Sequence, residues 1–495
     1  MLKKLRVLFA AIFFVAITLL FLDVSGVMKH WFGWMAKVQL VPAVLSVNLG
    51  IIIFLALLTI LFGRLYCSVI CPMGVFQDIV SSIHKKFNKK HLYKYRKSCN
   101  VLRYVVLVVF VALLLAGIGG VAALIEPYSA FGRVASNLLA PIYAGVNNIL
   151  AFFAERMNSY AFYPVDVWVK AGATLAVAVV TFVVIAYLSW RYGRLYCNTI
   201  CPVGSFLGLI SRYSIFKPVI NTEKCNGCGL CAMKCKSECI NSKEHKIDYS
   251  RCVVCFNCIE NCTKGAISYS LRKGCSTSSC QAKGEDAPKD NSRRAFMQGV
   301  AIAVASAPLA AKAAGGRVVA ELEDKKSYKR ETPIAPPGSK SIANLNQHCT
   351  ACQLCVQNCP NGVLKPATGE YGIEGFMQPT MSYDKGFCRA NCNVCSTVCP
   401  NGAIAPITIE EKASTKIGRA VINLENCVVN TDGVTCGNCS RHCPTKAIMM
   451  IRKDGKQIPT VDTEKCIGCG ACEYVCPARP FSAIHVEGNE IHHLM

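Results

Sequence analysis

Six groups of four cysteines supply most of the chemistry in this sequence. The first two groups follow the spacing C-x2-C-x2-C-x3-C and consist of Cys225, Cys228, Cys231, Cys235 and of Cys252, Cys255, Cys258, Cys262. Three thiolates spaced in this way bind three irons of one 4Fe-4S cluster, and the fourth ligates the neighbouring cluster. We therefore predict that Cys262 completes the first cluster and Cys235 the second. A zinc site with four cysteines uses two separated C-x2-C pairs, so these continuous runs favour clusters.

Four further groups lie between residue 346 and the end of the sequence, and a proline follows the last cysteine of each. Their members are Cys349, Cys352, Cys355, Cys359; Cys388, Cys392, Cys395, Cys399; Cys427, Cys436, Cys439, Cys443; and Cys466, Cys469, Cys472, Cys476. Sequential and nested exchange of fourth ligands are both compatible with the spacing. The sequence thus predicts six 4Fe-4S clusters. Cys99, Cys239, Cys275 and Cys280 stay without a predicted ligand role.

Another cysteine pattern occurs twice, 130 residues apart. Residues 62–76 and 192–206 share the string GRLYC, two variable residues, and then ICP-x-G-x-F. Cysteines at positions i and i+4 share one face of a helical turn, so two such pairs offer the four thiols that a tetrahedral metal or a cluster takes. We predict a shared redox or metal site, the membrane cysteine site, formed by Cys67, Cys71, Cys197 and Cys201. Two separate redox-active thiol pairs, or simple packing of small apolar side chains, are the alternatives.

Apolar segments must position this second set of cysteines. The sequence is 52% hydrophobic and 17% charged, which is unusual for a purely soluble chain and excludes disordered and fibrous classes. Four stretches approach the roughly 20 residues that cross a bilayer, namely 5–22, 40–62, 101–125 and 168–190. Lysines and arginines cluster before the first stretch, between the second and third, and after the fourth, which predicts a cytoplasmic N-terminus. Residues 23–39 and 126–167 are then loops on the outer side.

The net charge of +24 is no evidence for a nucleic-acid partner. Six clusters with a charge of about −2 each would cancel roughly half of it. The dense basic run at residues 85–97 is typical of a segment that faces solvent or lipid head groups. Membrane lipid is therefore the expected partner of this charge, and nucleic acid is not.

The predicted fold is multidomain, with an α-helical membrane bundle followed by α+β ferredoxin-like 4Fe-4S domains. The bundle has four helices and a fifth segment that serves as signal or anchor. Ser292-Arg-Arg-Ala-Phe296 and the apolar run behind it are typical of a twin-arginine export signal, which carries folded, cluster-bearing domains across a membrane. The predicted divisions are 1–216 membrane domain, 217–270 cytoplasmic two-cluster domain, 271–291 linker, 292–314 signal or anchor, 315–345 linker and 346–495 exported four-cluster domain.

These motifs carry a resemblance in two halves. Residues 1–270, with the duplicated C-x3-C-P motif, resemble the NapH-type membrane ferredoxins, relatives of the NosR and CcoG proteins. Residues 292–495 resemble the NapG/MauM-type exported ferredoxins, so the chain is similar to a fusion of the two. The resemblance implies a quinol dehydrogenase component of the bacterial inner membrane that draws electrons from the quinone pool. It also implies a periplasmic four-cluster domain that passes them to a periplasmic reductase or cytochrome.

Electron transfer from quinol to a periplasmic reductase is accordingly the predicted function. The membrane cysteine site is expected near the inner face, so a mobile quinol, oxidised near the outer face, is needed to bridge the hydrocarbon core of about 30 Å. His30 and Glu126 have the right depth for quinone ligands, but an interfacial aromatic belt and a helix cap are the favoured explanations of these residues. One alternative is a copper reductase or maturation factor similar to CcoG. Another is a redox-sensing or assembly subunit. No catalytic residue is predicted.

Overall fold

The computed structural model describes residues 2–23, 26–88, 93–159, 162–165, 167, 170–271, 325–453 and 455–494. The chain divides into two compact units, of which the first joins Met1–Ser270 with Glu323–Met495 and the second is Leu271–Leu322. All the elements below belong to the first unit, apart from the last residue of one strand. The predicted export signal at 292–314, together with Cys275 and Cys280, lies outside the described residues.

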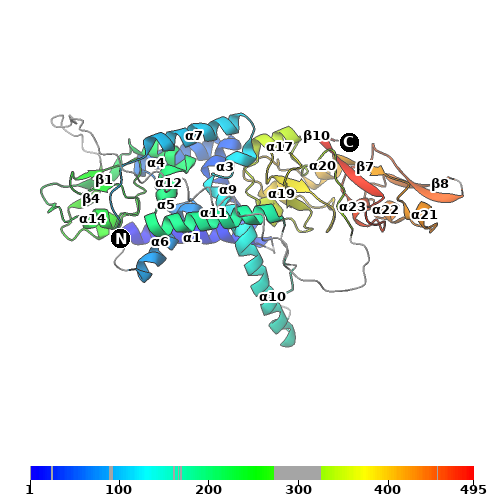
Figure 1. The fold of residues 1–495 in the computed structure, drawn as a ribbon, viewed down its shortest axis with the longest axis horizontal. Helices are drawn as coiled ribbons and strands as arrows, with labels where there is room; N and C mark the ends of the chain where they lie inside the picture. Colours follow the sequence, from blue (N-terminus) through cyan, green and yellow to red (C-terminus); the bar gives the residue numbers. More distant parts are fainter. Residues whose placement is uncertain are drawn as a thin grey trace, which may run out of the picture. The chain divides into compact units, whose positions relative to one another are not determined.

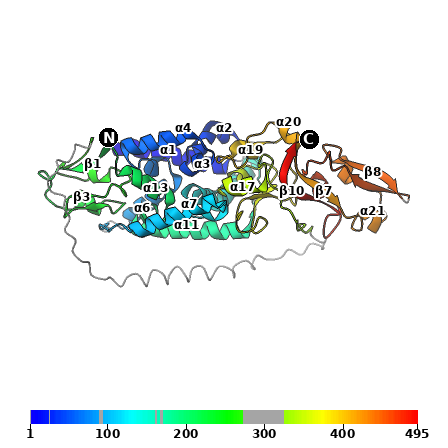
Figure 2. The ribbon, with the colours of Figure 1, turned by 90° about the horizontal axis from the view of Figure 1, so that it is seen from above.

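Two of the four predicted membrane stretches are confirmed as long apolar helices. Helix α1 (Leu2–Leu22) and helix α11 (Gly172–Tyr192) each have 21 residues, enough to span a hydrocarbon core. Figures 1 and 2 show both helices running along the same axis in the two views. The short helix α2 (Val27–Lys37) follows α1, in a segment predicted to be a loop.

The stretch predicted at 40–62 is a broken helix in the structure. Helix α3 (Leu40–Leu45) ends at a turn in which Val47 has a φ of 52°. Helix α4 (Leu49–Phe62) then begins with the Asn48 side chain accepting a hydrogen bond from the backbone N–H of Ile51. With 14 residues, α4 is shorter than the roughly 20 residues of a full span. Hydropathy alone does not detect this break, because nearly all side chains of residues 40–62 are apolar.

The stretch predicted at 101–125 is likewise interrupted. Helix α7 (Asn100–Leu115) has 16 residues and ends before Gly117, whose φ of 75° favours glycine. The short helix α8 (Gly119–Ala122) follows. The described residues therefore contain three helices long and apolar enough to cross a membrane, where the sequence predicted four.

The third of these helices lies within residues 126–167. The sequence predicted a loop there, and this prediction is wrong for most of the segment. Helix α9 (Pro127–Val134), a π-helical turn (Ala135–Leu139) and helix α10 (Ala140–Arg156) form one 30-residue helix. Glu126 begins it by accepting the backbone N–H groups of two following residues. The mean hydropathy of this stretch is only moderate, which hid the helix. Figure 1 shows α10 running crosswise to α11.

The two copies of the cysteine motif fold into the same helix–break–helix arrangement. In the first copy α5 (Tyr66–Val69) precedes α6 (Pro72–Phe87), and in the second α12 (Leu195–Thr199) precedes α13 (Pro202–Ser211). The proline of each motif occupies the first turn of the second helix, where its missing N–H costs nothing. The second cysteine of each motif is therefore the N-cap residue of that helix.

Two cysteine-rich segments, residues 216–271 and residues 325–494, consist of short helices and two-stranded sheets. They are named the inner and the outer segment after the sides predicted for them. The inner segment pairs β1 with β4 and β2 with β3. Its elements are β1 (Phe216–Ile220), α14 (Leu230–Met233), β2 (Ile240–Asn241), β3 (Lys246–Ile247), α15 (Asn257–Glu260) and β4 (Ile267–Leu271). The outer segment begins with α17 (Ile342–His348), α18 (Leu354–Gln357), β5 (Leu364–Pro366), β6 (Pro379–Met381), α19 (Val394–Val398) and α20 (Ile409–Ser414). It ends with β7 (Thr415–Ile422), α21 (Val428–Thr431), α22 (Asn438–Arg441), β8 (Ile448–Lys453), β9 (Lys456–Val461), α23 (Ala471–Tyr474) and β10 (Ile484–Leu494).

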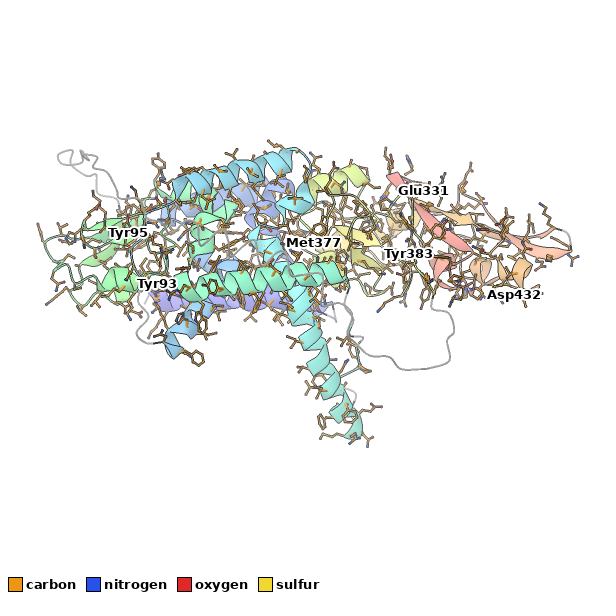
Figure 3. The ribbon with its side chains drawn as sticks, viewed as in Figure 1. Tyr93, Tyr95, Glu331, Met377, Tyr383 and Asp432 are labelled. Carbon is orange, nitrogen blue, oxygen red and sulfur yellow. The ribbon has the colours of Figure 1, made fainter. Side chains whose placement is uncertain are left out.

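The outer segment packs directly on the membrane helices. Met377, labelled in Figure 3, is fully buried and packs with Ala123 and Ala351. Farther along the same segment, Tyr383 is also fully buried and donates a hydrogen bond of 2.6 Å to the carbonyl of Gly468. The hydrophobic core is thus continuous from the helices into the outer cysteine groups.

Candidate functional site

The inner cysteine-rich segment encloses two small cavities, and each is lined by one predicted set of cluster ligands. Cys225, Cys228, Cys231 and Cys262 line the first cavity. Cys235, Cys252, Cys255 and Cys258 line the second. The structure therefore brings together the sets that the spacing predicts, with the fourth cysteines exchanged. Four convergent sulfurs around a closed space are the donor set that a 4Fe-4S cluster requires.

The second cavity also contains a cysteine to which the sequence analysis gave no role. Cys239 is buried, and its Sγ lies 3.6 Å from the Sγ of Cys235. The sequence signal was the C-x3-C spacing of this pair, which lies outside the regular quartet. Cys239 is a spare thiol beside the second set of ligands.

In the outer segment the fourth ligands are exchanged sequentially. Cys443 lines one cavity together with Cys466, Cys469 and Cys472. In the converse set, burial raises the pKa of Cys427 and Cys439, and the nearby Cys476 thiolate raises both further. Nested exchange would instead have joined the first outer quartet with the fourth and the second with the third.

The charge interactions within the first two outer quartets agree with the same exchange. Burial raises the pKa of Cys349, Cys352 and Cys355, and the nearby Cys399 thiolate adds to all three shifts. Burial also raises the pKa of Cys388 and Cys395, with a further contribution from the Cys359 thiolate. Within the described ranges, no three His, Cys, Asp or Glu side chains converge tightly enough to hold a single ion. A quartet that binds a different iron with each sulfur needs a wider spacing than a single ion does.

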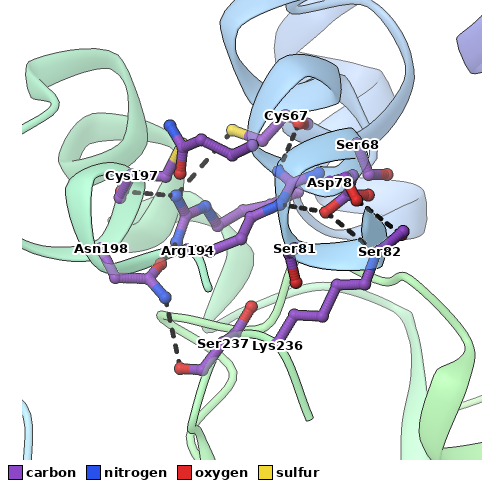
Figure 4. A network of polar contacts seen from close by, with 12 residues as sticks. Cys67, Ser68, Asp78, Ser81, Ser82, Arg194, Cys197, Asn198, Lys236 and Ser237 are labelled. Carbon is purple, nitrogen blue, oxygen red and sulfur yellow. Dashed lines mark hydrogen bonds and ion pairs between the residues drawn. The ribbon is translucent and has the colours of Figure 1, made fainter. Parts of the chain in front are cut away.

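All four thiols of the membrane cysteine site are buried in one hydrophobic cluster. The two copies of the motif are joined there by a reciprocal exchange of arginines, one half of which is drawn in Figure 4. Arg194 donates a hydrogen bond of 2.6 Å to the carbonyl of Cys67, and Arg64 donates one of 3.1 Å to the carbonyl of Cys197. Each copy therefore fixes the cysteine of the other, which the sequence repeat alone did not reveal.

A glycine in each copy makes this close packing possible. A Cβ atom at Gly74 would lie 2.2 Å from the carbonyl oxygen of Cys67, and one at Gly204 would lie 2.2 Å from that of Cys197. Real Cβ atoms do not approach oxygen so closely. The glycines shared by the two motifs thus allow each second helix to pack against the cysteine that precedes it.

Arg194 belongs to a buried ion cluster. Asp78 accepts hydrogen bonds from Arg194 Nε at 2.9 Å and from Arg6 Nη1 at 3.1 Å, and the Lys236 amine lies 3.4 Å away. Burial by itself would raise the pKa of Asp78, but the three cations hold it far below its usual range. One carboxylate therefore faces three positive charges, as Figure 4 shows for two of them.

Arg64 has no carboxylate partner among the residues that the structure describes. It is fully buried and donates to Asn198 Oδ1 at 2.9 Å and to the carbonyl of Ser250 at 3.0 Å, while its Nε has no partner. Its guanidinium also lies 3.9 Å from Cys67 Sγ. A buried cation without an anion is costly, so an anionic occupant of the adjacent cysteines fits this surrounding. A thiolate-ligated cluster, with a charge of about −2, is such an occupant.

Hydrogen bonds to the sulfur atoms point to the same occupant. Gln77 Nε2 lies 3.3 Å from Cys197 Sγ, and the backbone N–H of Gly204 lies 3.3 Å from Cys201 Sγ. N–H groups directed at cysteine sulfurs stabilise thiolates and tune the potential of iron–sulfur clusters.

The membrane cysteine site contacts the inner cysteine-rich segment beside its ligands. The backbone N–H of Arg194 donates to the carbonyl of Lys236 at 2.9 Å, and Asn198 donates to the carbonyl of Ser237 at 3.3 Å. Arg64, in the first copy of the motif, donates to the carbonyl of Ser250 in the same segment. Lys236 follows Cys235 directly in the sequence, so one polar shell surrounds both sets of cysteines.

On its opposite side the membrane cysteine site reaches toward the outer segment. Tyr196, which precedes Cys197, donates a hydrogen bond of 2.8 Å to the carbonyl of Ile125. The helix that begins two residues later carries Gly132, where a Cβ atom would lie 2.5 Å from the carbonyl of Cys352. The sequence analysis predicted this site near the inner face; in the structure Tyr196, Ile125 and the start of α9 also link it to the outer segment. The broken, short helices around it bring both segments close.

The two residues considered for quinone binding do not form a site. His30 is exposed and lies edge-on to Trp31, with 6.2 Å between the ring centroids. Glu126 is buried and accepts the backbone N–H groups of Tyr128 and Ser129. His30 therefore matches the interfacial aromatic belt, and Glu126 matches the helix cap.

Three sequence families match segments of the chain. One described as a 4Fe-4S binding domain matches residues 46–90 and 173–222, which contain all four cysteines of the membrane site. A 4Fe-4S dicluster domain matches 433–479, and another 4Fe-4S binding domain matches 218–241. The chain is a ferredoxin-type 4Fe-4S protein. No solved structure matches this ferredoxin-type chain.

Curated relatives of this ferredoxin-type protein match it in parts. It is 41% identical over 100 residues to the uncharacterized protein MJ0749 of Methanocaldococcus jannaschii, covering 20% of this chain and 39% of that one. It is 24% identical to the putative electron transport protein YccM of Escherichia coli, covering 47% of this chain and 58% of YccM. The methylamine utilization ferredoxin-type protein MauM of Methylophilus methylotrophus is 32% identical, over 29% of this chain and 66% of MauM. The chain thus spans less than two thirds of each of these three relatives.

Proposed function

We propose that this protein is a membrane-bound iron–sulfur electron-transfer protein of the bacterial inner membrane. It oxidises quinol and passes the electrons through 4Fe-4S clusters to a periplasmic reductase or cytochrome. The observation that carries the proposal is the membrane cysteine site, which is buried and lined by cations. It contacts the inner segment through Arg64 and Ser250, and Tyr196 joins it to the start of α9, which packs on the outer segment at Gly132. The relatives named as electron-transport and ferredoxin-type proteins support the same class of activity.

The proposal assigns one 4Fe-4S cluster to each of six exchanged cysteine sets and a seventh centre to the membrane cysteine site. Bound clusters supply one-electron carriers. The chain itself supplies the thiolates, excludes water and sets the charge around each site. Arg64 and Arg194 stabilise negative charge at the membrane cysteines, so they favour the reduced, more negative form of an occupant there.

The orientation of the protein follows from its basic residues. The run at 85–97 and the basic start of α1 are on the cytoplasmic side under the positive-inside rule. The inner cysteine-rich segment is then cytoplasmic, and the outer one, which the proposed export signal precedes, is periplasmic. This sidedness agrees with the position of the two segments on opposite sides of the membrane cysteine site.

Rapid mixing tests the proposal directly. Protein purified anaerobically in detergent is oxidised and mixed with a short-chain quinol, and the visible cluster absorbance is followed. We expect rapid bleaching in the wild type, slowed when Cys67 and Cys197 are both replaced by serine. Replacement of the exposed Cys99 by serine is the matched control and leaves the rate unchanged.

Two outcomes contradict the proposal. If quinol bleaches nothing although iron and sulfide analysis shows intact clusters, the protein is not a quinol dehydrogenase. If one copper ion per chain binds to the four membrane cysteines instead, the copper reductase or maturation function replaces it.

A further inference from the structure

A cavity of about 680 Å³ lies where the membrane helices end against the outer cysteine-rich segment. Leu22, the last residue of α1, and Ala140 and Ala144, in the first turns of α10, form its apolar side. Gln357 and Cys359, from the outer segment, line it as well. The cavity therefore joins a membrane-helix end to a predicted cluster ligand, and neither the family matches nor the proposed function assigns it.

Lys170 is one of several charged side chains that line this cavity, and the others are Asp23, Lys29, Lys385 and Arg389. Lys170, just before helix α11, lines it, and its amine donates a hydrogen bond to Gln357 Oε1. An ammonium group has three donors, so two others remain after this bond. The pair of an ammonium and an amide can bind a ring oxygen in this cavity.

The cavity also lies at the entrance to the outer clusters. Cys359 is proposed to complete the set of Cys388, Cys392 and Cys395, and Arg389, next to Cys388, lines the cavity too. A molecule bound in this space touches residues that carry the ligands of one cluster. An electron could therefore pass from the bound molecule to this cluster without another side chain between the two.

We propose that this space, the Lys170 cavity, binds the ring of quinol during its oxidation. The inference rests on the proposed function and adds the position of the substrate. Its volume falls within the range of about 300–1,000 Å³ that is typical of small-molecule sites in proteins, and its lining combines apolar residues of the helix ends with charged residues. Aromatic side chains from both sides, Tyr143 and Phe387, are placed to contact a planar ring.

The reaction in the cavity balances without further reagents. Quinol breaks two O–H bonds and becomes quinone, and it gives up two protons and two electrons. The protons leave to water through the open side of the cavity. Cys359, Cys388, Cys392 and Cys395 would hold an oxidised 4Fe-4S cluster, and this cluster and its neighbours would accept the two electrons one at a time. Lys170 holds one ring oxygen by a charge-assisted hydrogen bond and stabilises it as it loses its proton.

Photolabelling tests the position independently of turnover. Intact protein in detergent is irradiated with an azido-substituted short-chain quinone, digested and mapped by mass spectrometry. We expect the label on the first turns of α10 or on residues 356–361, and we expect excess unlabelled quinone to prevent it. Ala144→Phe, which fills the cavity from α10, should reduce labelling at least tenfold.

Variants of Lys170 test its contribution to binding. Lys170→Met should raise the quinol concentration for half-maximal bleaching about tenfold, and Lys170→Arg should restore most of it. Lys37→Met removes an exposed charge from the end of α2 and is the matched control, with no change expected. Iron content and bleaching by dithionite should be the same in all variants.

The results separate this inference from the proposed function. Label outside the cavity, with quinol still bleaching the wild type, overturns the Lys170 cavity and leaves the function standing. Label inside the cavity without bleaching keeps the binding site and overturns quinol oxidation. Label displaced by anionic phospholipid but not by quinone would assign the cavity to a lipid head group and overturn the inference.

Discussion

The two copies of the C-x3-C-P motif have the same backbone and different charge. Asp78 in the first copy corresponds to Gly208 in the second, 130 residues later. Asp78 binds Arg194, the arginine of the other copy, at 2.9 Å. At Gly208 a Cβ atom would lie 2.5 Å from the carbonyl of Ser250, so no side chain fits. The duplication thus preserves the scaffold of the cysteines while only one arginine receives a carboxylate.

This difference shows what each copy contributes. The first copy gathers Arg6, Arg194 and Lys236 around one carboxylate and so joins α1, the second motif and the inner segment. The second copy brings the Ser250 carbonyl next to Gly208 and leaves Arg64 without a counter-ion in the described part of the chain. The first copy therefore fixes the structure, and the second leaves a positive charge available to the cysteines.

The largest effect is expected from the cysteines themselves, where the copies are equivalent. Cys67→Ser and Cys197→Ser should each remove the whole membrane centre, because a site shared between the copies needs both pairs. We expect each variant to lose the iron of one cluster, about four atoms per chain. Iron and sulfide analysis with electron paramagnetic resonance measures the loss. Unequal losses in the two variants would mean two separate thiol pairs.

Asp78 is the next most sensitive position because it is where the copies differ. Asp78→Asn leaves three buried cations without a counter-charge, which should lower the free energy of unfolding by about 3–5 kcal/mol. Thermal unfolding in detergent measures the change. Glu260→Gln, which removes the exposed ion pair with Lys3, is the control and should cost less than about 1 kcal/mol. Equal effects at the two carboxylates would show that the buried cluster is not a structural anchor.

Much of the site was predictable from the sequence because the signals were local. The quartet spacing predicted the exchange of Cys235 and Cys262. In the structure Cys262 lines the cavity of the first quartet, and Cys235 lines the cavity of the second. The repeat predicted that the four membrane cysteines belong together, and in the structure Arg64 and Arg194 join the two copies at Cys197 and Cys67. In both cases the chemistry of a few neighbouring residues determines the local backbone.

The membrane helices were less predictable because hydropathy averages over breaks. The turn at Val47 and the left-handed Gly117 interrupt stretches that are apolar throughout. Helix α10 was missed for the opposite reason, since polar residues such as Asn147 and Asn148 lower its hydropathy although the helix is continuous. The reciprocal arginines depend on contacts across more than 100 residues, and no local pattern reports such contacts.

The glycines of the motif should respond equally in the two copies. Gly74→Ala and Gly204→Ala each place a Cβ atom 2.2 Å from a cysteine carbonyl, so both should lower the free energy of unfolding by about 1–3 kcal/mol. The same thermal measurement applies. Gly145→Ala, on α10 with nothing within 4 Å of the new atom, is the matched control. A large difference between Gly74 and Gly204 would contradict the pseudo-equivalence of the copies.

The smallest effect should distinguish the two arginines. Arg64→Gln removes a buried charge that no carboxylate offsets, so it should lower the reduction potential of the membrane centre by on the order of 40 mV, or about 1 kcal/mol. Arg194→Gln should lower it less, because Asp78 already compensates Arg194. A redox titration followed by electron paramagnetic resonance gives both values, and Arg64→Lys, which keeps the charge, should recover most of the shift. If Arg194→Gln has the larger effect, the charge difference between the copies does not tune the site, and hydrogen bonding to the cysteine carbonyls would be the property that the duplication preserves.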